Sequence, residues 1–368
     1  MEISVNRKIA VFVPSMNGGG VQRAILNMVN EFVKRDFSVD LILATYEGPY
    51  LKKLDPRVRI VNLEKKRVIT CLPQLIRYLK RVRPHSLLSA MEHANIIALW
   101  ARALAGVNTR IVISNHANLT EGLLRNESAF NKLFIYLIRM FYRKANAIVA
   151  VSKGGADDVA NVARLPRERI NVIYNPLLTE EFYIQSSQSL NHSWFSEGAV
   201  PVVLAVGRLA KVKDYPTLIK AFSLVRSNIP SRLMILGEGE ERHSLEMLVE
   251  QLGLQQDVLM PGFVTNPFVY MGKAAVFVLS SLTEGFGNVL VEAMACGTPV
   301  ISTDCPTGPR EILTDDGILV PVGNEEALAE EIIRVLNGTS KLNLPLDRLK
   351  RFNIDEIVDR YLDLMFLK

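Results

Sequence analysis

Residues 9–32 read IAVFVPSMNGGGVQRAILNMVNEF, and this stretch decides the fold. Its first part, Ile9–Pro14, has the continuous apolar character of a buried strand. A glycine-rich turn, Asn17–Gly20, comes next, and the apolar residues after it recur at helical spacing on one face. These residues are Val21, Ala24, Ile25, Met28, Val29 and Phe32. The order of strand, loop and helix predicts the opening unit of a doubly wound α/β sheet.

The same alternation of apolar strands and helical patterns continues along the chain. In the first half we expect strands at Ser38–Ala44, Arg59–Leu63, Ser86–Ala90, Arg110–Ser114 and Ala147–Val151. In the second half we expect them at Val202–Val206, Arg232–Leu236, Val258–Met260, Val276–Leu279, Pro299–Ser302 and Gly317–Val320. Such alternation is typical of parallel sheets. Because 368 residues also exceed what one core usually organises, the sequence predicts two Rossmann-like α/β domains.

A change of pattern marks the domain boundary. Residues 175–200 contain Pro176 and a cluster of serine and glutamine, and they have no clear period, which is typical of a connection. We therefore predict an N-terminal domain over residues 1–177, a linker over 178–199 and a C-terminal domain over 200–351. A last helical pattern, Ile354–Phe366, has no strand after it. We expect residues 352–368 to pack back toward the N-terminal domain.

The composition is that of a globular protein, with 49% hydrophobic and 22% charged residues. Its three cysteines are widely spaced, so neither a disulfide framework nor a zinc site is indicated. The charged N-terminus lacks the order of a secretory signal. The most lipid-like stretch, Leu133–Tyr142, is shorter than the roughly 20 apolar residues that a membrane span needs. We expect a cytoplasmic protein that does not cross a membrane.

The net charge is unevenly distributed between the two halves. Residues 1–177 hold 27 Lys and Arg against 13 Asp and Glu, a net +14, and the remainder carries −9. This asymmetry predicts that the first half faces something anionic, and the acidic second half argues against nucleic acid. Basic residues near residues 139–144 interleave with an apolar stripe, which fits an anionic membrane surface but is equally consistent with an ordinary buried face. The stripe is Phe130, Leu133, Phe134, Leu137, Ile138 and Phe141.

Residues 281–297, SLTEGFGNVLVEAMACG, form the most informative motif. The segment follows a strand, contains two glycines where a helix must begin, and ends at a glycine suited to a helix C-cap. The N–H groups of the first helical turn, together with the helix dipole, would form a site for a diphosphate. Glu284 in the turn and Glu292 in the helix could then accept hydrogen bonds from sugar hydroxyls. Two glutamates at this spacing are also common on solvated helices, so the motif is judged with its context.

Residue by residue, this segment resembles the E-x7-E signature of the retaining glycosyltransferases of family four, which have the two-domain GT-B fold. The resemblance implies that Glu284 touches the donor sugar and that Glu292 touches the ribose hydroxyls. It implies donor-binding positions at Gly285, Phe286, Gly287, Asn288, Val289, Val264 and Gly237. Further segments match in the family's order, and the resemblance covers nearly the whole chain. They are Val151-Ser-Lys-Gly, Tyr174-Asn-Pro, Gly237-Glu-Gly and Pro261-Gly-Phe-Val.

Residues 207–216, GRLAKVKDYP, are similar to the family segment whose Arg and Lys clamp the diphosphate. Arg208 directly follows an apolar strand and Gly207, at the carboxyl end where open α/β sheets bind ligands. A guanidinium and the ammonium of Lys213 would neutralise the charge that builds up on the leaving phosphate. The plain alternative is that both are solvated charges after a strand. Because the sequence contains no Asp-x-Asp, the usual ligand pair of metal-dependent glycosyltransferases, we predict that neither a metal nor a cofactor is needed.

Two features of the first half complete the predicted site. His116 follows a predicted strand and resembles the family's catalytic histidine, although a lone histidine is more often structural. Gly18, Gly19 and Gly20 lie in a loop that contacts the donor phosphate or an anionic acceptor in the family. These glycines do not make the dinucleotide-binding G-x-G-x-x-G pattern, which excludes that interpretation.

Together these features predict retaining transfer of a hexose or N-acetylhexosamine from a nucleotide diphosphate sugar, expected to be UDP-linked. Residues 303–312 resemble family members that act in bacterial polysaccharide or lipid-linked oligosaccharide assembly, so we expect such an acceptor at the inner face of the bacterial plasma membrane. A glycosidase using Glu284 and Glu292 is one alternative, but it leaves Arg208 and Lys213 without a role. A membrane-associated binding protein with a decayed site and a UDP-sugar epimerase of similar architecture are the others.

Overall fold

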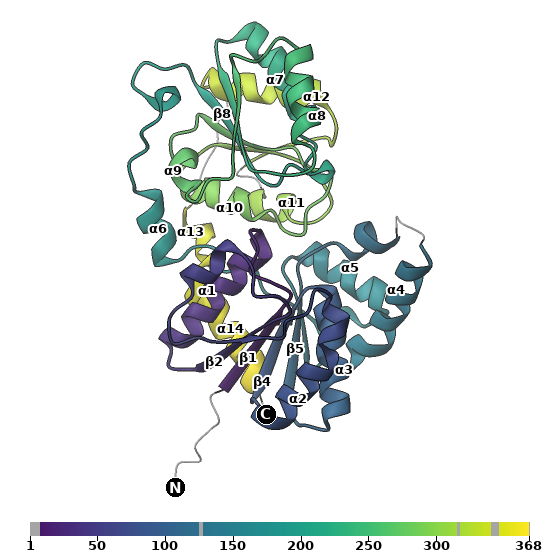
Figure 1. The fold of residues 1–368 in the computed structure, drawn as a ribbon. Coiled ribbons are helices and arrows are strands. Elements are labelled where there is room, and N and C mark those ends of the chain that lie inside the picture. Colours follow the sequence, from purple (N-terminus) through teal and green to yellow (C-terminus); the bar gives the residue numbers. More distant parts are fainter. Residues whose placement is uncertain (1–7, 125–127, 315–316, 340–345, 368) are drawn as a thin grey trace. The chain divides into compact units, whose positions relative to one another are not determined.

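The computed structural model describes residues 8–124, 128–314, 317–339 and 346–367. The chain divides into two compact units (Figure 1). Unit 1 comprises Met1–Pro176 and Arg351–Lys368, and unit 2 comprises Leu177–Lys350. Each unit is built around a parallel β-sheet, so the predicted class of two Rossmann-like α/β domains is confirmed.

Unit 1 contains a seven-stranded sheet of order β3-β2-β1-β4-β5-β6-β7, in which all pairs are parallel. Its strands are β1 (Lys8–Val13), β2 (Ser38–Leu43), β3 (Arg59–Asn62), β4 (Ser86–Ala90), β5 (Arg110–Asn115), β6 (Ala147–Ala150) and β7 (Ile170–Val172). The central strands are almost continuously buried because helices cover the sheet on both faces.

The helices of unit 1 divide between the two faces of this sheet (Figure 1). Phe12 of β1 belongs to the core under α2–α5, and its neighbour Val11 points to the core under α1 and α14. The helices are α1 (Gly20–Lys34), α2 (Leu72–Val82), α3 (Glu92–Ala105), α4 (Ala129–Phe141), α5 (Lys153–Ala163) and α14 (Ile354–Phe366). Short helical turns are η1 (Pro49–Lys53), η2 (Val68–Cys71), η3 (Thr120–Leu124), η4 (Tyr142–Lys144), η5 (Arg167–Arg169) and η8 (Lys350–Phe352).

The last helix, α14, returns to unit 1 and packs on β4 and β5 beside α1. Ser86 Oγ donates to the carbonyl oxygen of Met365 at 2.5 Å, and Arg110 Nε donates to that of Leu364 at 2.5 Å. Tyr361 and Met365 are buried in the same core as Val11. Helix α14 therefore covers part of one face of the first sheet.

Unit 2 contains a six-stranded parallel sheet of order β10-β9-β8-β11-β12-β13. The strands are β8 (Val202–Val206), β9 (Arg232–Leu236), β10 (Val258–Gly262), β11 (Val276–Leu279), β12 (Val300–Thr303) and β13 (Ile318–Val320). The helices are α6 (Glu180–Ser186), α7 (Tyr215–Asn228), α8 (Arg242–Gln251), α9 (Phe268–Met271), α10 (Asn288–Ala295), α11 (Pro309–Leu313), α12 (Glu325–Leu336) and α13 (Leu346–Leu349), with turns η6 (Ser193–Phe195) and η7 (Lys211–Lys213).

Each sheet has one point where the strand order reverses. In unit 1 this point lies between β1 and β4, and in unit 2 it lies between β8 and β11. Loops that leave the carboxyl ends of two such strands diverge and leave a crevice, which is the usual ligand site of open α/β sheets.

The structure contains local features that the sequence did not predict. Residues 178–199, expected to be a linker, carry α6 and η6 and cluster with unit 2. The three-residue edge strand β7 was not predicted. Over the part of the chain that the structure describes, no helix combines the length and apolar character needed to cross a bilayer.

Candidate active site

The loops after β8 and β11 hold the two halves of the predicted phosphate and sugar site. Arg208 lies two residues beyond the end of β8, and Lys213 ends the turn η7 that follows. Glu284 lies on the loop between β11 and α10. Because β8 and β11 are the neighbours at the reversal point of unit 2, the structure brings these two segments together.

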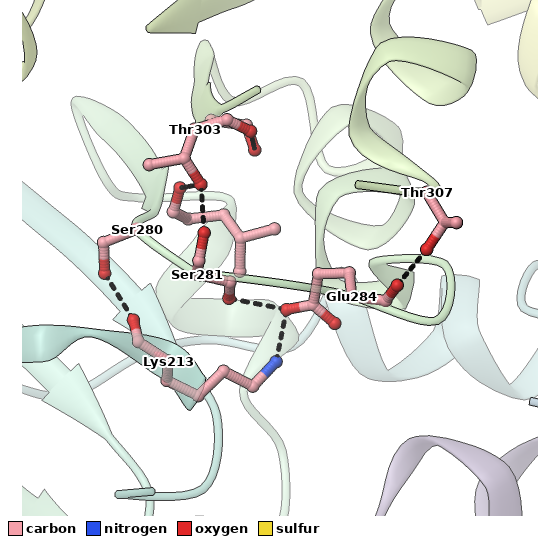
Figure 2. Close-up of polar contacts among 8 residues, drawn as sticks. Lys213, Ser280, Ser281, Glu284, Thr303 and Thr307 are labelled. Atoms are coloured by element: carbon pink, nitrogen blue, oxygen red, sulfur yellow. Dashed lines mark hydrogen bonds and ion pairs between the residues drawn. The ribbon is translucent and has the colours of Figure 1, made fainter. Parts of the chain in front are cut away.

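Glu284 and Lys213 form the centre of this arrangement (Figure 2). Lys213 Nζ lies 2.5 Å from Glu284 Oε1, and Ser281 Oγ donates to the same oxygen at 2.6 Å. Both charged side chains are mostly shielded from solvent, which strengthens their attraction. Within the described residues, every side-chain contact of Glu284 uses Oε1. Its second oxygen, Oε2, is therefore available to accept a hydrogen bond from a ligand.

Three hydroxyl groups hold the loops around this ion pair (Figure 2). Ser280 Oγ donates to the carbonyl oxygen of Lys213 at 2.7 Å, and Thr303 Oγ1 donates to that of Ser281 at 2.6 Å. Thr307 Oγ1 donates to the carbonyl oxygen of Glu284 itself. The sequence interpretation assigned no role to these hydroxyls, although Thr303 and Thr307 lie inside a segment that it singled out, residues 303–312.

Close backbone approach explains one of the predicted glycines. Gly237 has a φ of 150°, and a Cβ there would lie 1.9 Å from the carbonyl oxygen of Gly207. The loop after β9 can therefore run directly against the loop after β8, where Leu209 N donates to Glu238 O at 2.9 Å. Gly237 has a packing reason in the structure, and its contact with a donor stays a prediction.

The N-terminus of α10 has the properties of an anion site. Gly287, with a φ of 96°, is its N-cap and has no side chain of its own to cap the helix, and the first turn contains no acidic residue. Asn288 and Val289 begin the helix, so their N–H groups lie at its positive end. Glu292 follows one turn later and is almost completely buried.

The remaining predicted donor residues lie around this loop. Gly285 and Phe286 lie between Glu284 and the helix, and Phe286 is buried.

Arg208 is exposed, and no hydrogen bond or ion pair of its side chain to another described residue is present. Val264 follows β10, the strand at the edge of the sheet, and its contact with a donor stays a prediction. Lys213 and Tyr215 both lie over Gly207, where a Cβ would be 3.5 Å from Lys213 Cε and 2.8 Å from the Tyr215 hydroxyl. Tyr215 was missed by the sequence interpretation.

In unit 1, His116 follows the end of β5 by one residue. Its Nε2 lies 3.0 Å from Ser114 Oγ. Burial lowers the pKa of His116 from 6.5 to about 4, against an opposing contribution from the Asn175 amide. The imidazole is therefore neutral at physiological pH.

Gly18, Gly19 and Gly20 lie at the carboxyl end of β1, the reversal point of unit 1. The three glycines are exposed, and α1 begins at Gly20 without a side-chain cap or an acidic residue in its first turn. Gly48 packs tightly against the backbone at the start of this loop, because a Cβ there would lie 2.1 Å from the carbonyl oxygen of Met16. The contact of this loop with a donor phosphate or an anionic acceptor stays a prediction.

No group of three or more His, Cys, Asp or Glu side chains suited to a metal ion occurs among the described residues. The absence of a metal requirement stays a prediction.

Comparison with known proteins identifies the family. Residues 18–181 match the family described as Glycosyltransferase Family 4, and residues 190–348 match Glycosyl transferases group 1. The chain is 31% identical over 346 residues, 90% of each protein, to the Campylobacter jejuni enzyme named N-acetylgalactosamine-N,N'-diacetylbacillosaminyl-diphospho-undecaprenol 4-alpha-N-acetylgalactosaminyltransferase. The chain belongs to glycosyltransferase family 4. The resemblance seen in the sequence is thereby confirmed.

Other comparisons agree with this glycosyltransferase assignment. The chain is 26% identical to the lipopolysaccharide core biosynthesis glycosyltransferase LpsE of Rhizobium meliloti, covering 95% of this chain and 96% of that one. The fold of this glycosyltransferase matches the solved structure of Anabaena HepE in complex with UDP-glucose, with a TM-score of 0.81 and 20% identity over 97% of this chain and 98% of that chain. These structures share the GT-B fold, and the two-domain GT-B prediction is confirmed.

Proposed function

We propose that this glycosyltransferase moves a hexose or N-acetylhexosamine from a UDP-sugar to a lipid-linked or polysaccharide acceptor, with retention of the anomeric configuration and without a metal. The observation that carries the proposal is the Lys213–Glu284 pair on the loops that lead into the N-terminus of α10, at the reversal point of unit 2. It combines a cation, an anion-binding helix end and a carboxylate oxygen that is available for a sugar hydroxyl.

Each group has a distinct part in the proposed reaction. The ammonium of Lys213, the guanidinium of Arg208 and the N–H groups at the start of α10 stabilise the diphosphate as negative charge grows on it. Glu284 Oε2 accepts a hydrogen bond from the donor sugar, while Lys213 and Ser281 hold Oε1 in place. Glu292 accepts hydrogen bonds from the ribose. The carboxylates thus orient the donor, and the cations help the leaving group depart.

The bond changes are a front-face substitution at the anomeric carbon. The bond between this carbon and the acceptor oxygen forms as its bond to the diphosphate oxygen breaks, on the same face. The acceptor proton passes to the departing phosphate. No protein base is required, in agreement with the lowered pKa of His116, about 4, which makes its imidazole a weak proton acceptor.

The choice of donor and acceptor rests on the relatives. Anabaena HepE has been crystallised with UDP and with UDP-glucose, which favours a UDP-linked donor here. The two Campylobacter jejuni relatives are named as N-acetylgalactosaminyltransferases acting on diphospho-undecaprenol or PP-undecaprenol glycans. LpsE acts in lipopolysaccharide core biosynthesis. These names favour a lipid-linked glycan as the acceptor.

Helix α4 supports attachment to an anionic membrane. Only part of the predicted apolar stripe is buried in the structure. Phe134 and Ile138 are buried, whereas Phe130 and Leu133 are exposed. Phe130, Leu133, Tyr136 and Met140 are 62%, 57%, 57% and 36% exposed and recur at helical spacing. The helix contains no acidic residue, and basic residues lie in and after it at Lys132, Arg139, Arg143 and Lys144. An exposed apolar row with basic neighbours suits the surface of an anionic bilayer at the inner face of the plasma membrane.

The proposal is tested by turnover of UDP-sugars with and without a polyprenyl-diphosphate-linked saccharide. We expect UDP release that depends on the acceptor, and a glycoside product with the donor's configuration. Hydrolysis of glycosides would instead identify a glycosidase. Interconversion of UDP-sugars without acceptor would identify an epimerase, and vesicle binding without any turnover would identify a binding protein.

A further inference from the structure

Tyr215 carries a hydroxyl group that the proposed reaction does not use. It is the first residue of α7, and its side chain lies over Gly207, where a Cβ would be 2.8 Å from the hydroxyl oxygen. Lys213 lies over the same glycine, with its Cε 3.5 Å from that Cβ position. Because glycine has no side chain, both groups can approach the backbone there. The Tyr215 hydroxyl therefore lies beside the Lys213 side chain, at the turn that carries Arg208.

This hydroxyl has no protein partner. Among the described residues no hydrogen bond to it is present, and it is not one of their fully enclosed unpaired polar atoms. Tyr215 as a whole is 4% exposed, so the ring is buried and the small open fraction includes the hydroxyl. The hydroxyl of a buried tyrosine usually finds a hydrogen-bond partner. An unpaired hydroxyl that opens into a ligand crevice is therefore a candidate for binding the ligand.

The neighbouring charges indicate which ligand group fits. Burial and the negative charge of Glu284 raise the pKa of Tyr215, so the hydroxyl keeps its proton and acts as a donor. A donor on the same loop as the cations Lys213 and Arg208 suits an oxygen of the diphosphate. Glu284 is the group proposed to contact the donor sugar. The diphosphate oxygen nearest to this carboxylate therefore belongs to the phosphate that carries the sugar.

We propose that Tyr215 is a further catalytic residue, whose hydroxyl donates a hydrogen bond to the phosphate that carries the sugar. This bond strengthens as negative charge grows on the departing phosphate, and the hydroxyl keeps its own proton throughout. The inference rests on the proposed function, in which this phosphate is the leaving group. It adds a neutral donor to the two cations and the helix N-terminus that stabilise the diphosphate.

Tyr215→Phe removes only the hydroxyl and tests the contact in the full-length protein. We expect the affinity for UDP, measured by calorimetry, to fall about tenfold to more than a hundredfold, as for a lost hydrogen bond to a charged group. The affinity for UMP, which lacks the second phosphate, should stay the same. An unchanged affinity for UDP would overturn the inference. An equal loss for UDP and UMP would also overturn it, because the hydroxyl would then only shape the loop.

The stability of the same variant provides a second readout. Because the hydroxyl has no partner among the described residues, its removal should leave the Tm of the ligand-free protein unchanged or raise it. Tyr78→Phe is the matched control, since Tyr78 is 7% exposed and its hydroxyl donates to Asp40 Oδ2 at 2.6 Å. This control should melt below the wild type and bind UDP equally well. If Tyr215→Phe loses as much Tm as Tyr78→Phe, the hydroxyl stabilises the fold and the inference is wrong.

Turnover separates this inference from the proposed function. At saturating UDP-sugar and acceptor, Tyr215→Phe should lower kcat about tenfold or more, and an unchanged kcat would exclude a catalytic role. A wild-type protein that binds UDP but transfers no sugar would refute the proposed function, and the comparison of UDP with UMP would still decide the contact of Tyr215. If the wild type binds GDP in place of UDP, the comparison is made with GDP and GMP. A wild type that binds no nucleoside diphosphate would refute both proposals.

Discussion

Lys213 Nζ lies 2.5 Å from Glu284 Oε1, although 71 residues separate the two along the chain. The pair exists because β8 and β11 are neighbours in the sheet. Lys213→Ala would leave Glu284 without its cation and weaken diphosphate binding. We expect kcat/KM to fall about tenfold to more than a hundredfold. Lys211→Ala, which removes an exposed lysine from the same turn, should remain near wild type in the same assay. Equal losses in both variants would argue against a specific role of Lys213.

Arg208 and Glu292 have inferred contacts with the diphosphate and the ribose. We expect Arg208→Ala and Glu292→Gln each to lose most transfer activity, because each removes a charge-assisted hydrogen bond made to the donor. Thermal melting should show that Arg208→Ala remains folded, since Arg208 is exposed. Glu292→Gln keeps the volume of a buried side chain. Near wild-type turnover in either folded variant would refute its assignment.

In the proposed reaction, Lys213 and Arg208 take the place of a metal ion by stabilising the negative charge on the diphosphate. Turnover should therefore survive dialysis against EDTA, measured with the preferred UDP-sugar and acceptor. Loss of turnover that magnesium or manganese restores would show that the diphosphate needs a metal as well.

The depressed pKa of His116 makes a pH-dependent contribution to stability. Burial lowers this pKa from 6.5 in the unfolded chain to about 4 in the folded one. Between these values the unfolded chain binds the extra proton, so the stability of the folded state decreases as pH falls through this window. From pH 7 to 5 the loss is about 1 to 2 kcal/mol. Denaturant unfolding of His116→Asn should show a smaller loss over this range than the wild type, and identical losses would contradict the shift.

The exposed row on α4 should govern attachment to membranes. We expect full-length protein to sediment with phosphatidylglycerol vesicles and Phe130→Ser/Leu133→Ser to sediment less. Leu224→Ser/Met247→Ser, which changes two exposed apolar residues of unit 2, is the control and should sediment like wild type. Raising salt from about 0.1 M to 1 M shortens the screening length from about 10 Å to 3 Å and should weaken the binding. If both double variants bind equally, α4 is not the attachment site.

Much of the fold could be predicted because buried parallel strands are continuously apolar. Strands β4, β8, β9 and β11 and helix α14 have the bounds that the sequence indicated. Strand β7 was missed because it has three residues with Asn171 in the middle. Helix α6 was missed because its surroundings are polar, although Thr179, whose Oγ1 accepts a hydrogen bond from Phe182 N, is a helix-start signal that could have found it.

The sequence located Lys213 and Glu284 but could not predict that they meet. Their contact depends on which strands are adjacent and on the path of both loops, which local patterns do not determine. The same is true of Thr307, which approaches Glu284 from the loop after β12. Hydroxyl groups give little sequence signal, because serine and threonine serve equally well as turn residues and as caps.

The placement of α14 gives the protein an unusual order of assembly during translation. Synthesis of Leu177–Lys350 takes roughly 9 to 35 s at about 5 to 20 residues per second, and α14 emerges only afterwards. Throughout that interval the nascent first sheet lacks the helix that covers part of β4 and β5, and by the end of it the later unit has all of its strands. The later-synthesised unit can therefore fold to completion before the earlier one. A ribosome-bound chain must tolerate an open apolar face until its final helix arrives.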